Sequence, residues 1–318
     1  MSGTSPETTQ QPPRPIGPGV AGLLSVAVFA SLQLLPPVGV FVALLAPLPL
    51  LHFAASGRPS VIAWGWVAIA LTGAFFVLHW PDLLIGVSGF LLLTVWPVVS
   101  IEAWVRRTWN TGRWLAIVAG VAWASLVALF VAGAWPLAPA DALGVMIARD
   151  LAANTSLTEA LGLGGAATEA VAQALHLVAY LAPSLLTMYV VAVALWARPR
   201  LPLLGFARGS EPFAEFGSEE WLPVGFLVGG VAWVVAPEPV KWLGGNMLFT
   251  VLGLYFVHGL AIIHFYLGRR LAGNRWVRVG VGVLCVQVPL AGVVSVLGLI
   301  DAFFRLRRGS GSDEEKTS

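Results

Sequence analysis

The stretch that decides the fold class is "NMLFTVLGLYFVHGLAIIHFYLGRR", residues 246–270. Between residues 247 and 267 it contains no Asp, Glu, Lys or Arg, and Arg269 and Arg270 follow directly. About 20 consecutive apolar residues are enough for a helix to cross the hydrocarbon core of a bilayer. The whole chain has this character: 58% of its residues are hydrophobic and only 11% are charged, against about 25% charged in soluble domains. The sequence therefore predicts a polytopic membrane protein.

Similar apolar segments recur along the chain. They are residues 20–35, 38–54, 61–78, 83–101, 114–135, 171–196, 221–236, 247–267 and 279–302. Pro47 and Pro49 interrupt the second segment and Pro289 interrupts the last, so we expect these two to be kinked or re-entrant rather than straight. The predicted fold is all-α, a polytopic transmembrane helical bundle with eight or nine membrane segments.

Composition also predicts the division of the chain. Residues 1–19 are polar and rich in Pro and Thr, as disordered tails are. Residues 20–304 form the predicted transmembrane domain, with an outer loop carrying a short helix at 136–170 and an inner loop at 198–220, and residues 305–318 form a charged tail. A cytoplasmic N-terminus places most of the 18 Lys and Arg residues inside, as the positive-inside rule requires.

Motifs of soluble enzymes are missing from the sequence. It has no phosphate-binding Gly-rich loop, no His-Glu-x-x-His pair and no Gly-x-Ser-x-Gly elbow. Cys285 is the single cysteine, and the five histidines have no metal-ligand spacing. We expect no catalytic site, no metal and no cofactor. The net charge of +2 suggests no nucleic-acid partner.

A row of polar side chains marks the segment "EAVAQALHLVAYLAPSLLTMY", residues 169–189. At helical spacing they share an arc of roughly 80°; they are Glu169, Gln173, His176, Tyr180, Ser184 and Thr187. An unsatisfied polar group in hydrocarbon costs several kcal/mol, so this stripe should face protein or water. Two interpretations stay open. The stripe forms interhelical hydrogen bonds that hold helices together, or it lines a cavity for a ligand or ion.

The run at 246–270 supplies a second group of polar residues. Asn246 follows a Gly pair and either caps the helix or lines a cavity, and His258 lies deep in the apolar run. The predicted ligand-binding residues are Gln173, His176, Tyr180, Ser184, Asn246 and His258.

Small residues and one charged pair predict helix contacts. Small residues four apart allow close approach of helix backbones; the two predicted sets are Gly17, Ala21 and Ser25 in the first segment and Gly120, Ala124 and Ala128 in the fifth. Asp301 precedes Arg305 by four residues, the spacing of an ion pair on one helix. We expect this pair to lie at the membrane edge.

These pieces together resemble the YybS-like family of bacterial integral membrane proteins, a domain of unknown function. The resemblance is carried by "PLPLLHFAASGRP" after Pro36, by "GNMLFTVLGLYFVHGLAII" with Asn246 and Gly259, and by "GLIDAFFRLR" with Gly298, Asp301 and Arg305. It spans most of the chain. The family in turn is similar to the substrate-binding S-components of energy-coupling-factor vitamin transporters.

That resemblance implies a helical bundle in the bacterial cytoplasmic membrane with a small-molecule pocket open to the outside. It also implies that small residues of the first helix dock on a coupling subunit, and Gly17, Ala21 and Ser25 would do so here. The expected function is a small-molecule binding or transport subunit, with the bilayer, a ligand and a coupling subunit as partners. The alternative is a structural or assembly protein without a substrate.

Overall fold

The computed structural model describes most of the apolar segments. The described residues are 17–34, 38–55, 60–78, 83–106, 111–134, 173–174, 176–178, 180–197, 220–238, 240–270 and 275–304. Every regular element among them is helical, in agreement with the predicted all-α fold. The remaining residues include the tails, the 136–170 loop and nearly all of the 198–220 loop, so the predictions for those regions fall outside the described residues.

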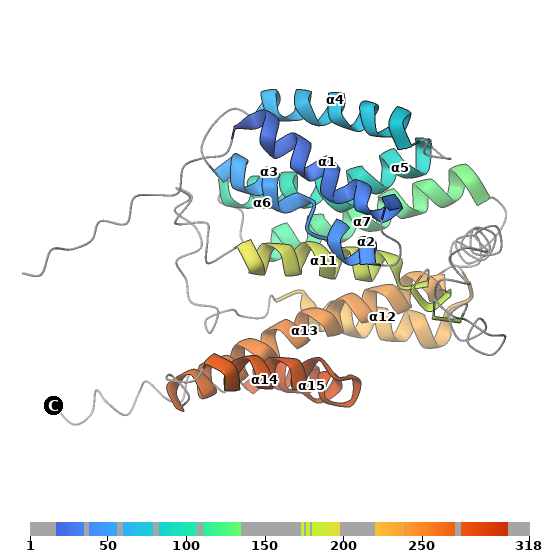
Figure 1. Cartoon of the computed structure of the whole chain (residues 1–318). Coiled ribbons are helices and arrows are strands. Elements are labelled where there is room, and N and C mark those ends of the chain that lie inside the picture. The colour runs from blue at the N-terminus through green and yellow to red at the C-terminus, as the bar shows by residue number, and fades with distance from the viewer. Residues whose placement is uncertain are drawn as a thin grey trace, which may run out of the picture. The chain divides into compact units, whose positions relative to one another are not determined.

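The helices correspond to the predicted apolar segments and are labelled in Figure 1. They are α1 (Pro18–Leu34), α2 (Val38–Ala43), α3 (Pro47–Ala55), α4 (Ser60–Leu78), α5 (Leu83–Phe90), the π-helix η1 (Leu91–Val95), α6 (Trp96–Arg106), α7 (Thr111–Ala134), α11 (Ala182–Ala197), α12 (Leu222–Val235), α13 (Val240–Arg270), α14 (Arg275–Val286) and α15 (Val288–Phe304). The chain divides into two compact units, one of residues 1–107 and 194–210 and the other of residues 108–193 and 211–318.

Helix α1 organises the first unit by packing against α2, α3 and α4. At Gly22, an added Cβ would lie 3.0 Å from the backbone N of Val67 on α4, so only a residue without a side chain fits easily. The ring of Phe29 meets the edge of Phe90 with centroids 5.1 Å apart. Close backbone approach and aromatic packing together explain why one face of this apolar helix is buried within its unit.

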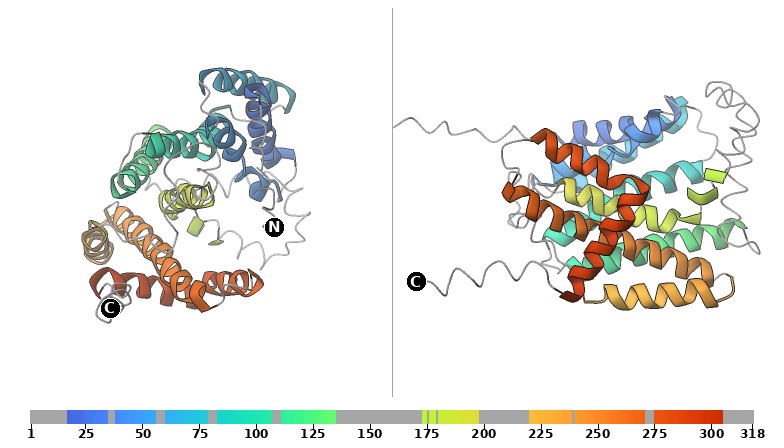
Figure 2. Two further views of the ribbon diagram at one scale, coloured as in Figure 1. Left: turned by 90° about the vertical axis from the view of Figure 1, so that its left-hand side faces the viewer. Right: turned by 90° about the horizontal axis from the view of Figure 1, so that it is seen from below.

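Helix α13 organises the second unit, with α12 and α15 against it (Figures 1 and 2). The contact with α12 uses small residues on both helices. A Cβ on Gly229 would lie 2.9 Å from the backbone N of Leu248, and one on Gly244 would lie 2.6 Å from the Cβ of Ala232. The 31 residues of α13 therefore contact different neighbours along their length.

The prolines break helices where the sequence predicts a break. The second segment divides into α2 and α3, with a turn at 44–46 and Pro47 as the first residue of α3. The last segment divides into α14 and α15, and the two parts are bent by 94°. Both segments are therefore interrupted, because proline supplies no amide hydrogen to the preceding turn.

The number of long spans is lower than the number of predicted segments. Among the described residues, Gly86–Val105 and Val240–Leu267 are long and apolar enough to cross a membrane, and the bent α14–α15 pair would be a third. The other apolar helical stretches found there are 10–17 residues long, and two of them, Ala63–Phe75 and Arg113–Ala124, are parts of α4 and α7. The breaks at prolines shorten two of the predicted segments, and the segment at 171–196 begins outside the described residues. The predicted number of eight or nine is thus not reproduced by these helices.

Candidate functional site

The candidate site lies where α13 and α15 cross. A Cβ on Gly298 would overlap the backbone oxygen of Tyr255, and one on Gly259 would overlap the backbone oxygen of Val294. The two backbones are therefore in direct contact, with one glycine from each helix at the contact. This is the close approach that small residues permit between membrane helices, and it brings side chains next to the glycines within reach of the opposite helix.

At this crossing His258 meets Asp301. The Nε2 atom of His258 lies 2.7 Å from the Oδ2 atom of Asp301, and the two side chains are only 2% and 5% exposed. One proton lies in this contact, donated either by the imidazole N–H to the carboxylate or by the carboxyl O–H to the imidazole. The site is thus a buried hydrogen bond between two ionisable groups from different helices.

His258 lies well inside the apolar part of α13, whereas Asp301 lies near the end of α15. At 1.5 Å rise per residue, His258 lies about 27 Å from Val240 and about 14 Å from Leu267, the ends of the apolar span. Ionisable groups at such a depth in membrane helices are rare, lie within the bundle and mark ion, proton or substrate pathways. The position of the pair is the strongest chemical signal in the described chain.

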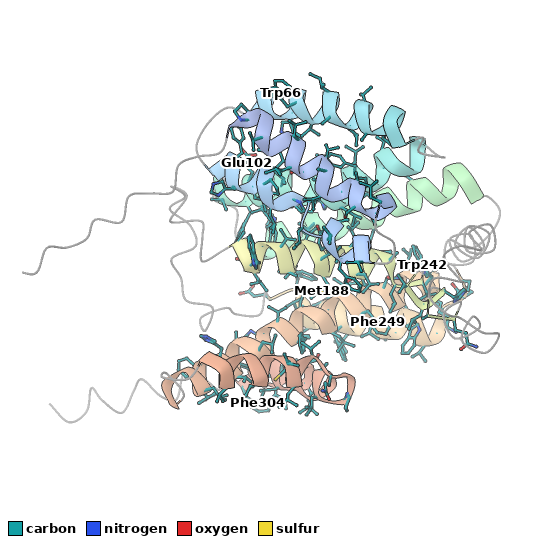
Figure 3. All side chains as sticks on the ribbon, in the orientation of Figure 1. Trp66, Glu102, Met188, Trp242, Phe249 and Phe304 are labelled. Atoms are coloured by element: carbon teal, nitrogen blue, oxygen red, sulfur yellow. The ribbon has the colours of Figure 1, made fainter. Side chains whose placement is uncertain are left out.

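A second polar cluster joins α11 to the start of α13. Asn246 donates hydrogen bonds from Nδ2 to the backbone oxygens of Tyr180 (2.8 Å) and Trp242 (3.1 Å). Its Oδ1 accepts from the backbone N–H of Ser184 (3.3 Å), and the Ser184 hydroxyl lies 2.8 Å from the same oxygen. Trp242, labelled in Figure 3 at the start of α13, also donates from Nε1 to the Tyr180 oxygen at 2.9 Å.

This cluster forms because the helix is interrupted before Pro183. In an unbroken helix the N–H of Ser184 would donate to the oxygen of Tyr180. Here that N–H donates to Asn246, and Asn246 and Trp242 donate to the Tyr180 oxygen instead. Both Nδ2 hydrogens of Asn246 are donated and its Oδ1 accepts from the Ser184 N–H, while the single Ser184 hydroxyl proton goes either to this Oδ1 or to the Asn246 backbone oxygen 2.7 Å away. The position of Asn246 inside α13 shows that it does not act as the predicted helix cap.

The polar stripe of the sequence divides into two parts. Ser184 and Thr187 are buried, and the Thr187 hydroxyl donates to the backbone oxygen of Pro183 at 2.8 Å. Tyr180 is half-buried, whereas Gln173 and His176 are exposed. Glu169 lies outside the described residues. The structure thus brings Ser184 to Asn246 in a packing contact, whereas Gln173 and His176 do not join it.

The residues predicted to make helix contacts also divide. Ala21 and Ser25 on α1 are fully buried, whereas a Cβ on Gly17 would meet no atom within 4 Å. On α7, a Cβ on Gly120 likewise meets nothing within 4 Å, and Ala124 and Ala128 are exposed. The described partner of Asp301 is His258, and the predicted partner Arg305 lies outside the described residues.

Replacing Asn246 by alanine should destabilise the protein by about 2 to 3 kcal/mol, because the buried oxygen and N–H groups that it serves lose their partners. Thr250 provides a matched control one turn along α13. Its side-chain oxygen is buried and has no hydrogen-bond partner among the described residues, so Thr250→Val should change stability by less than about 0.5 kcal/mol. Thermal unfolding of both purified variants measures this difference, and equal losses would contradict it.

A broad apolar surface accompanies these polar clusters. On α12, one helix face is exposed along its length, with Val224 60%, Leu227 64%, Val231 62% and Val234 76% exposed. Large uncovered apolar faces are typical of surfaces that contact lipid or protein rather than water.

Residues 22–302 match the family described as predicted membrane protein, DUF2232. The chain belongs to this family. The DUF2232 match covers most of the chain, including both polar clusters and the His258–Asp301 pair.

The other comparisons gave no match: no curated protein and no solved structure is significantly similar to this DUF2232 chain. Among the described residues, no group of three or more His, Cys, Asp or Glu side chains could hold a metal ion. The contact of His258 with Asp301 itself offers the chemistry of a histidine and a carboxyl group that share a proton.

Proposed function

We propose that this DUF2232 protein is a small-molecule binding or transport subunit of the bacterial cytoplasmic membrane. The resemblance of the sequence to the YybS-like family, and of that family to vitamin-transporter S-components, favours this class, for which we expect eight or nine membrane segments and a cytoplasmic N-terminus. No catalytic role, metal or cofactor is part of the proposal. A coupling subunit would contact the first helix, where a Cβ on Gly17 would meet none of the described atoms within 4 Å.

The observation that carries this proposal is the buried pair of His258 and Asp301. A membrane protein that only scaffolds other proteins gains little from two ionisable groups in its interior, because their desolvation can exceed their mutual attraction. Apolar residues of similar volume would often hold the same helices at least as well. The pair is therefore better explained by a role in ligand or ion handling.

The predicted ligand-binding residues contribute to this proposal unequally. His258 belongs to the buried pair, and Gln173 and His176 are exposed polar groups on the segment before α11. Ser184 and Asn246 use their hydrogen bonds on each other. They would bind a ligand only if the contact between α11 and α13 opened, so we assign the primary ligand role to His258.

A second candidate function is favoured by the polar cluster around Asn246. Its hydrogen bonds hold α11 against α13, as the packing interpretation of the polar stripe requires. A structural or assembly protein without a substrate would need such a contact. It would not need the His258–Asp301 pair, and the experiment below separates the two functions on that ground.

The purified full chain should be stabilised by a compound from a panel of vitamins and nucleobases in a thermal-shift assay. A ligand at 100 times its Kd stabilises the folded state by about 2.7 kcal/mol, since it binds the native state alone. His258→Gln should weaken that response. His264→Gln, an exposed histidine on the same helix, serves as the matched control and should respond like the original protein.

The assembly function predicts another outcome. In that case no compound of the panel raises the unfolding temperature, and His258→Gln behaves like His264→Gln. Both results together would overturn the transport proposal.

A further inference from the structure

We propose that the His258–Asp301 pair is a proton-binding site, which releases and takes up one proton when the contact between α13 and α15 opens and closes. This inference deepens the proposed function by naming the ion to which binding or transport is coupled, and its physiological role rests on that function. The proton site itself rests only on the geometry of the crossing.

The chemistry follows from the 2.7 Å contact between His258 Nε2 and Asp301 Oδ2. The pair with its proton bound has two forms. In one, the proton is on the carboxyl group of Asp301 and both groups are neutral. In the other, it is on His258, which is then an imidazolium beside an ionised carboxylate, and the pair again has no net charge. Transfer of this proton from the pair to a water molecule leaves a net charge of −1 and yields a hydronium ion. No electron transfer and no covalent bond to another group is involved.

Burial makes this proton transfer dependent on conformation. A net charge in the interior of a membrane protein is costly unless water or an opposite charge reaches it. The two side chains are only 2% and 5% exposed, so water has little access to them in this conformation. Proton release therefore requires that the pair become accessible, and uptake of the proton favours the closed arrangement.

The crossing gives the two helices a defined contact at which to move. Gly259 and Gly298 place the backbones in direct contact beside the pair, so α15 can pivot there without side chains having to pass each other. The chain is broken between α14 and α15, which are bent by 94°. Movement of α15 consequently does not require the helical hydrogen bonds of α14 to break.

An experiment must distinguish proton exchange at the pair from proton exchange at other titratable groups nearby. The titratable side chains described on α13, α14 and α15 besides the pair are Lys241, Tyr255, His264, Tyr266 and Cys285. Helix α12 contains no titratable residue. Tyr255 is fully buried one turn before His258, whereas Lys241, His264 and Tyr266 are exposed, and Cys285 is buried on α14. Tyr255 is thus the neighbour on α13 that a control has to address.

Infrared difference spectroscopy of the purified full chain in lipid nanodiscs tests the proposal. Spectra are compared between about pH 5 and about pH 8, the range in which histidine chemistry operates. At the lower pH we expect one additional band per chain from the pair: a protonated-carboxyl band where the proton is on Asp301, or an imidazolium band where it is on His258. Asp301→Asn should abolish the carboxyl band, and His258→Gln should shift it or move its midpoint.

Two controls keep the test decisive. Tyr255→Phe and Ser295→Ala, which removes a hydroxyl bonded to the backbone of Ala291 on α15, should leave the carboxyl band unchanged. If Asp301→Asn does not fold, Asp301→Glu retains the carboxyl group and should shift the band. A folded protein with neither a pH-dependent carboxyl band nor a pH-dependent imidazolium band that His258→Gln removes, or an Asp301→Asn variant with an unchanged difference spectrum, would overturn the proton site.

The result is independent of the ligand experiment. A compound that stabilises the protein without any proton change would refute this inference and leave the proposed function standing. A proton change without any binding compound would support the proton site and count against the proposed small-molecule function.

Discussion

Replacing Gly298 by alanine is expected to lower the stability of the folded protein by about 3 kcal/mol, the upper end of the usual cost of overpacking. The added methyl group would overlap the backbone oxygen of Tyr255 and lie 2.9 Å from the backbone N of Gly259. Flexible side chains can move aside, but helix backbones cannot do so without separating α13 from α15. The loss should appear as a lower unfolding temperature of the purified variant.

Gly292 on the same helix is the matched control for this substitution. A Cβ there meets no atom within 4 Å, and alanine is a better helix former than glycine by up to about 1 kcal/mol. Gly292→Ala should therefore be neutral or slightly stabilising. Equal effects of the two substitutions would show that the helices do not cross at Gly298.

The second large effect concerns the buried pair. Asp301→Ala leaves His258 without its carboxyl partner in an apolar interior, and breaking a buried pair in this way costs about 3 to 5 kcal/mol. Replacement of both residues by leucine removes both desolvation costs, so the double variant His258→Leu/Asp301→Leu should regain most of that loss. Unfolding temperatures of the single and double variants measure this directly.

Ser295→Ala is the control for position on α15, because its hydroxyl bonds only to the backbone of Ala291 in the described structure. Its cost should stay near about 1 kcal/mol. If the double variant were less stable than the original protein by the sum of the losses measured for His258→Leu and Asp301→Leu, the two residues would be energetically independent, and the pair would not exist as described.

Much of the fold follows from the distribution of apolar residues. The predicted segments correspond to helices, and the breaks at Pro47 and before Pro289 follow from proline chemistry alone. The lengths of the spans do not follow, because periodicity cannot show where a segment stops being helical. The predicted segment at 83–101, for example, contains a π-helical turn at Leu91–Val95 that the sequence does not signal. The helix after this turn continues to Arg106.

The candidate site is predictable only in part. His258 is recognisable as an ionisable residue deep in an apolar run, and Asp301 as a charge near the end of another. The two residues are 43 positions apart along the chain. Their pairing depends on the crossing of α13 and α15, which brings them together. The available signal is that Gly259 adjoins His258 and Gly298 lies one turn before Asp301. Small residues next to isolated ionisable residues on two helices would have suggested this contact.

The polar stripe at 169–189 shows that a periodic pattern can also place residues in the wrong environment. Helical spacing correctly places Ser184 and Thr187 toward the interior, but it assigns Gln173 and His176 to the same environment, and these are exposed. The chain turns at Leu181, before Pro183, so the face of the preceding helical residues is not set by the face of α11. A single periodic pattern cannot describe two segments joined by a break.

The proposed role of His258 and Asp301 in function rather than in stability is tested most directly by one measurement. It is the ligand-induced thermal shift of the double variant His258→Leu/Asp301→Leu, made with a compound that stabilises the original protein. We predict a folded double variant, close to the original in unfolding temperature, whose shift with the compound is lost. A folded double variant that keeps the full ligand-induced shift would contradict the proposed role.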